Sequence, residues 1–119
     1  MNYIEFQIGG KLRGFRFGLK FLSDLFADLN VGFDGLGKLI DENPFKSRPA
    51  VLYHAHVNHC KSKGIPITFT QDDVYEWLET LPSGVSNDNV VQCTINVLES
   101  IKAHLPKTEE VEPQDEKKN

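Results

Sequence analysis

The chain has 119 residues, of which 39% are hydrophobic, 25% charged and 10% aromatic. This size and composition are those of one globular domain, and they exclude a second full domain. The formal net charge of −4 repels a phosphate backbone, so a general nucleic-acid binder is disfavoured, while a local basic patch stays open.

Cysteine content and the N-terminal sequence predict in which compartment the protein is found, the cytoplasm or the secretory pathway. Two cysteines, Cys60 and Cys93, are too few for a disulfide scaffold. The N-terminal stretch MNYIEFQIGG lacks the basic start and the long apolar run of a signal peptide. No stretch approaches the roughly 18 consecutive apolar residues of a membrane span. We therefore expect a cytoplasmic protein with no membrane partner.

The first elements are predicted to form a β-hairpin. Residues 2–8 alternate in polarity, as in a half-buried strand, with three apolar side chains on one face: Ile4, Phe6 and Ile8. Gly9 and Gly10 permit the positive φ angles of a tight turn. A second alternating segment carries Phe15 and Phe17. Because two strands alone are marginal in water, we expect helices to cover their apolar face.

Three helices are predicted after the hairpin. Apolar residues spaced by three and four indicate an amphipathic helix over residues 19–30. A shorter helix follows over residues 33–43, weakened by two glycines and ended by a proline. The third is expected from about residue 46 to residue 63, since proline is tolerated in a first turn, and Gly64 is its terminator.

Two more helices are predicted in the last part of the fold. Thr70 and Asp73 have the spacing of a capping box, in which each side chain bonds the backbone N–H of the other residue. The chain breaks at Pro82, and a cap among residues 86–88 begins a last helix that reaches about Leu105 with two apolar stripes. The predicted fold class is therefore α+β and mainly α, with an N-terminal β-hairpin followed by about four to five helices.

The C-terminal residues have a different composition. Residues 107–119 contain five acidic and three basic residues, one aliphatic residue and no aromatic residue. This is too little apolar surface to offset the conformational entropy lost on ordering. We therefore predict one domain over residues 1–106 and a disordered acidic tail over residues 107–119.

Histidine and cysteine side chains gather in the third predicted helix. His56, His59 and Cys60 fall within one sector of that helix and are candidate zinc ligands. No second pair of ligands lies across a loop, and His59 is close to the centre of an apolar stripe. A hydrogen-bonded structural histidine and a buried thiol are thus the preferred interpretation. No catalytic residue, metal or cofactor is predicted, because an activated thiol normally takes its base from another element.

A basic cluster lines the predicted hairpin and the start of the first helix: Lys11, Arg13, Arg16 and Lys20. Such residues can meet an acidic partner or a nucleic acid. The preferred interpretation is a solvated hairpin face that discourages edge-to-edge pairing of strands.

Two stretches resemble the small tail assembly chaperones of tailed bacteriophages and prophages. The first is IEFQIGGKLRGFRFGLKFLSDL, which is similar to the strand, glycine turn, basic aromatic strand and leucine-rich helix of that family. The second is AVLYHAHVNHCKSKGIPITFTQDDVYEWLE, which is similar to its helix, extended segment and T-x-x-D/E-V-x-x-W/L helix.

The resemblance implies a non-enzymatic helper in the host cytoplasm that is absent from the mature virion. Proteins of this family bind the tape measure protein and shield its apolar surface until tail tube subunits polymerise around it. The expected partners are therefore the tape measure protein, the tail tube protein and a second copy of the chain.

The apolar residues expected to contribute to association come from the hairpin and the last helix: Phe15, Phe17, Val90, Val97 and Ile101. The alternative is that these side chains pack against each other inside the monomer. Two other functions stay open. One is a small metal-binding protein built on the histidine and cysteine cluster, and the other is a nucleic-acid-associated regulator of a phage or mobile element.

Overall fold

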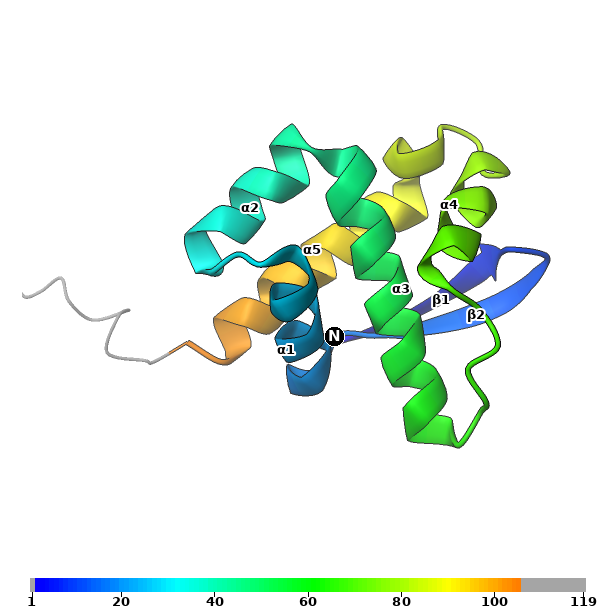
Figure 1. Ribbon diagram of the computed structural model, residues 1–119, viewed down its shortest axis with the longest axis horizontal. Helices are drawn as coiled ribbons and strands as arrows, with labels where there is room; N and C mark the ends of the chain where they lie inside the picture. Colours follow the sequence, from blue (N-terminus) through cyan, green and yellow to red (C-terminus); the bar gives the residue numbers. More distant parts are fainter. Residues whose placement is uncertain (1, 106–119) are drawn as a thin grey trace, which may run out of the picture.

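The computed structural model describes residues 2–105, and within them an antiparallel hairpin precedes five α-helices (Figure 1). The elements are β1 (Tyr3–Ile8), β2 (Lys11–Arg16), α1 (Leu19–Leu29), α2 (Phe33–Glu42), α3 (Pro44–Lys63), α4 (Gln71–Glu79), the 3₁₀ turn η1 (Gly84–Ser86) and α5 (Asp88–Ala103). The predicted fold class is confirmed. The predicted disordered tail lies outside the described residues. Within residues 2–105, no helix combines the length and the apolar character needed to cross a bilayer.

The hairpin turn has the glycine conformation predicted from the sequence. Gly9 and Gly10 have φ angles of 64° and 86°, in the left-handed region that glycine adopts without strain. Gly9 also lies against α4, because a Cβ atom at this position would be 2.7 Å from Cγ of Trp77. The absence of a side chain at Gly9 therefore lets the turn close onto the tryptophan ring.

Helix α3 is the centre of the fold and packs against β2 and against every other helix (Figure 1). It begins at Pro44, two residues earlier than predicted, because proline suits the first helical position, where an N–H is not needed. It ends as predicted at Gly64, whose φ is 70° and whose N–H bonds the carbonyls of Cys60 and Lys61. The middle of α3 is therefore largely buried, while exposed residues such as Phe45 and Lys63 lie near its two ends.

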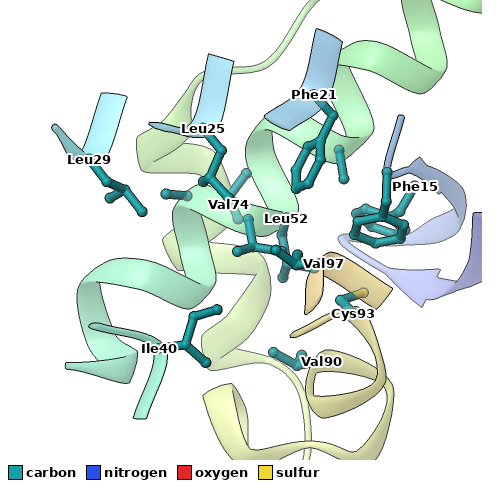
Figure 2. Close-up of a cluster of buried hydrophobic side chains, with 14 of the residues drawn as sticks. Phe15, Phe21, Leu25, Leu29, Ile40, Leu52, Val74, Val90, Cys93 and Val97 are labelled. Carbon is teal, nitrogen blue, oxygen red and sulfur yellow. The ribbon is translucent and has the colours of Figure 1, made fainter. Parts of the chain in front are cut away.

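One apolar core joins the hairpin to the helices (Figure 2). The rings of Phe6 and Phe15 stack with centroids 4.9 Å apart, and Phe17 meets Phe21 edge to face at 5.2 Å. Each buried aromatic side chain removes roughly 150–250 Å² from water. The helices thus cover the apolar hairpin face, as expected for two strands that are marginal alone.

Two predicted helix caps are present. The Thr70 hydroxyl accepts the N–H of Asp73 at 3.2 Å, and the Asp73 carboxylate accepts the N–H of Thr70 at 2.8 Å, which completes the predicted capping box. The Asn87 side chain accepts the N–H of Asn89 at 2.9 Å and caps α5, within the predicted range. These local patterns fix where α4 and α5 begin.

Candidate functional site

Four of the five side chains predicted to contact partners lie in the core. Phe15, Phe17, Val90 and Val97 have no exposed area. A side chain without exposed area cannot touch a partner while the fold is intact, so the structure corrects this expectation in favour of packing inside the monomer. The physical reason is that α5 lies across α3 and also packs on β1, which uses its wide apolar surface. Only Ile101 is partly exposed.

His56 is the centre of a polar and aromatic cluster between β2, α3 and α4. Its Nδ1 donates a hydrogen bond to the Gly14 carbonyl at 2.8 Å, on the edge of β2 that does not pair with β1. Its ring stacks on Phe69 with centroids 4.7 Å apart. Because a carbonyl only accepts, Nδ1 carries the hydrogen and Nε2 is left as an acceptor in the neutral ring.

Arg13 belongs to this cluster and is not part of a solvated face as the sequence indicated. Its Nη1 lies 3.4 Å from Nε2 of His56, while Nε and Nη2 donate to the carbonyls of Ile8 and Gly9 at 2.9 and 3.0 Å. The guanidinium carbon is 3.8 Å from the centroid of the Trp77 ring, which is cation–π geometry. Arg13 therefore holds the hairpin turn on α4.

The surroundings of His56 and Cys60 disfavour the charged forms of these two side chains. Burial lowers the pKa of His56, the bond to Gly14 opposes this, and the positive charge of Arg13 lowers the pKa further. Burial also raises the pKa of the Cys60 thiol, whose Sγ is 3.8 Å from Nε2 of His56, and Arg13 opposes that shift. A neutral imidazole beside a protonated thiol is not the charged pair that activates a cysteine nucleophile.

The three candidate zinc ligands do not converge. The rings of His56 and His59 are nearly parallel with centroids 6.0 Å apart, and Nδ1 of His56 is occupied by a carbonyl. Over residues 2–105, no group of three histidine, cysteine or acidic side chains is arranged to hold a metal ion. His56 is the buried histidine and His59 is only half-buried, whereas the sequence placed His59 nearer the apolar centre. The cause is that the edge of β2 lies over His56.

Two surface hollows are lined mainly by apolar side chains. The α3–α4 hollow, about 240 Å³, lies between the start of α3, α4 and η1, and its lining is Phe45, Tyr75, Leu78, Glu79, Gly84 and Val85. The α1–α5 hollow, about 300 Å³, lies between α1, the start of α2 and the end of α5, and its lining is Leu19, Leu22, Ser23, Phe26, Phe33, Ile101 and His104. Ile101 is the one predicted contact residue that reaches either hollow.

The sequence matches no protein-family model and no curated protein, and the fold matches no solved structure.

Sequence reasoning missed the residues that make the hollows apolar. Phe45, Leu19 and Phe33 are 71%, 63% and 58% exposed, the highest values among the large hydrophobic side chains. Phe45 and Leu19 lie in the first two positions of their helices, outside the periodic apolar stripes that predicted the core. A bulky apolar residue at the start of a helix and outside its apolar stripe was thus the sequence feature that could have indicated an exposed apolar surface.

Proposed function

We propose that the protein is a non-enzymatic assembly chaperone of the tailed-bacteriophage kind. It binds an apolar stretch of the tape measure protein in the host cytoplasm, keeps it soluble until tail tube subunits polymerise around it, and is absent from the finished virion. The observation that carries the proposal is the gathering of the most exposed apolar side chains at two hollows. Exposed apolar patches of this kind mark interaction surfaces. The resemblance of two stretches to this chaperone family supplies the identity of the partner.

The polar chemistry of the chain supports binding over catalysis. The His56 and Arg13 side chains already bond carbonyls of the chain, and the Cys60 thiol has a raised pKa. Volumes of about 240 and 300 Å³ lie below or at the lower limit of typical small-molecule pockets, which is about 300–1,000 Å³. Each hollow therefore suits one or two bulky side chains of a protein partner.

An amphipathic helix is the partner structure that fits these hollows. Such a helix inserts anchors spaced by three or four residues into apolar grooves. Each fully buried aliphatic or aromatic anchor contributes about 1.5–3 kcal/mol. Two hollows on one domain can bind two separate apolar stretches of a long partner, which raises the avidity above that of either hollow alone.

The test is coexpression with the tape measure protein encoded by the same genome, followed by measurement of how much of that protein stays soluble. Phe33→Gln and Phe45→Gln remove one apolar side chain from each hollow. Leu98→Gln is the matched control, because Leu98 is exposed on α5 but lines neither hollow. We expect each hollow variant to fold and to lose about tenfold in affinity, since 1.4 kcal/mol corresponds to a factor of ten.

If Phe33→Gln and Phe45→Gln solubilise the tape measure protein as well as Leu98→Gln does, the hollows are not its binding surface. A genome without a tape measure gene downstream and a tail tube gene upstream of this gene would remove the chaperone assignment itself.

A further inference from the structure

Positive side chains converge along the junction between β2 and the second half of α3. Two adjoining hollows of about 430 and 290 Å³ lie there and share Arg16 and Ser62 in their linings. Lys63 lines the first, and Lys20 and Lys61 line the second. We call the pair the basic groove. No acidic side chain from residues 2–105 lines either hollow.

Three of these cations have no carboxylate partner in the described part of the chain. Within residues 2–105, the salt bridges are Lys20 with Asp24 at 2.8 Å and His54 with Asp28 at 2.8 Å. Arg16, Lys61 and Lys63 therefore line the basic groove with no described carboxylate within salt-bridge distance, in a chain whose net charge is −4. Lysines in the last turn of α3 also favour the helix dipole, but this does not account for Arg16, which comes from β2.

The chain itself contains a complementary anion. Residues 108–116, TEEVEPQDE, carry five carboxylates and no basic side chain. This segment follows α5, whose end lies next to α1 (Figure 1). Leu19 lines the α1–α5 hollow together with His104, and it also lines the basic groove together with Lys61. The last described residues thus lie near one end of the groove, and residues 106–119 are long enough to span up to about 45 Å if fully extended.

We propose that the acidic segment 108–116 docks in the basic groove of its own chain, with its carboxylates on Arg16, Lys61 and Lys63. The planar guanidinium of Arg16 binds a carboxylate through two parallel N–H bonds, and the lysines act as point charges. Exposed ion pairs are individually weak, but a short tether keeps the segment at a millimolar effective concentration. The docked segment excludes other anions from the groove. This inference is independent of the proposed function.

The first experiment compares backbone amide NMR spectra of the full chain with those of a full-length variant whose five tail acids are neutralised. The changes are Glu109→Gln, Glu110→Gln, Glu112→Gln, Asp115→Asn and Glu116→Gln. We expect shift differences at the Arg16, Lys61 and Lys63 amides in low salt. They should disappear in about 1 M NaCl, where the screening length falls to about 3 Å.

A matched control separates docking from a general change of charge. Glu76→Gln with Glu79→Gln neutralises two exposed carboxylates on α4, which does not line the basic groove. This variant should shift amides near α4 and leave those of Lys61 and Lys63 unchanged. If the tail variant also leaves the groove amides unchanged in low salt, the segment does not dock.

A spin label distinguishes docking within one chain from docking between copies. Glu112→Cys provides a labelling site, since Cys60 and Cys93 are buried. Broadening of the Lys61 and Lys63 signals that persists on dilution supports the proposal. A different result would overturn it. If spin-labelled chains broaden these signals in ¹⁵N chains that carry no spin label, and the broadening is lost on dilution, the contact is between copies.

Binding of a short single-stranded oligonucleotide is the remaining comparison. If the tail occupies the groove, the tail-neutralised chain binds the oligonucleotide more tightly than the natural chain by severalfold. Equal binding to both chains would mean that the groove is an anion site that the tail leaves open, and the proposal would be wrong.

Discussion

Two sets of polar side chains on the second half of α3 have opposite surroundings. The first set is bound within the fold: His54 lies 2.8 Å from the Asp28 carboxylate, His56 bonds the Gly14 carbonyl, and Asn58 donates to Asp24 at 3.3 Å. The second set comprises Lys61 and Lys63, which face the basic groove and bond no carboxylate of residues 2–105. The difference teaches that the element opposite a side chain, more than its residue type, separates structural polar groups from those available for binding.

His54 and Asn58 meet carboxylates of α1, whereas His56 meets the edge of β2. A two-stranded sheet leaves one edge of each strand unpaired, and its backbone groups need hydrogen-bond partners when they are buried. His56 supplies that partner for Gly14. The last turn of α3 extends past this contact, so its lysines are exposed. Three substitution experiments test this comparison.

The largest expected effect comes from removing the bound histidine. His56→Ala leaves the Gly14 carbonyl without its donor and opens space beside Phe69, and these two losses together cost about 2–4 kcal/mol of unfolding free energy. His59→Ala is the matched control on the next turn, where only about 0.5–1 kcal/mol is expected. Urea denaturation of both variants measures the difference. Equal losses would show that the two histidines do not differ as we describe.

An intermediate effect is expected from pH. The pKa of His56 is lowered in the fold, chiefly by burial, so the unfolded chain binds more protons below the unperturbed value of about 6.5. Stability should therefore fall as pH drops from about 6.5 toward the lower pKa of the folded state. His56→Gln should reduce this slope but keep a part that comes from His59, whose pKa is also lowered, chiefly by burial.

Thermal unfolding over this pH range provides the measurement. Asp24 does not contribute to the change of stability in this pH range. The pKa of its carboxyl is lowered, so the stabilisation from the ionised carboxylate is lost only in more acidic solution. A natural chain whose stability is constant between pH 7 and pH 5 would contradict the buried neutral state of His56.

The smallest effect is expected from the groove lysines. Lys61→Ala with Lys63→Ala removes two exposed charges and should change the unfolding free energy by no more than about 0.5–1 kcal/mol, most of it through the helix dipole. Urea denaturation in low and high salt measures this, and the loss should shrink as salt screens the dipole. A loss as large as that of His56→Ala would place these lysines among the structural polar groups.

The sequence predicted the features that depend on nearby residues. The glycine turn, the capping box of Thr70 and Asp73, and the Gly64 terminator each involve residues only a few positions apart, and all three are confirmed. The fold class followed from the same local periodicities.

Features that depend on distant residues were not predicted. Arg13 reads as a solvated hairpin residue, yet its environment comes from His56 and Trp77, far along the chain. From the sequence, Phe15 and Phe17 were expected to form surplus apolar surface, but the helices packed on the hairpin bury both. Likewise, the exposure of Phe45 depends on which elements fail to cover it. Spacing in a sequence carries no information on such contacts.

The contact between the hairpin turn and α4 has a spectroscopic consequence. Trp77 is the only tryptophan of the chain, and its indole lies against both Gly9 and the guanidinium of Arg13. Any motion that lifts the hairpin from α4 changes the solvent and the cation around this one indole. Intrinsic fluorescence therefore reports on this single interface, without an added label.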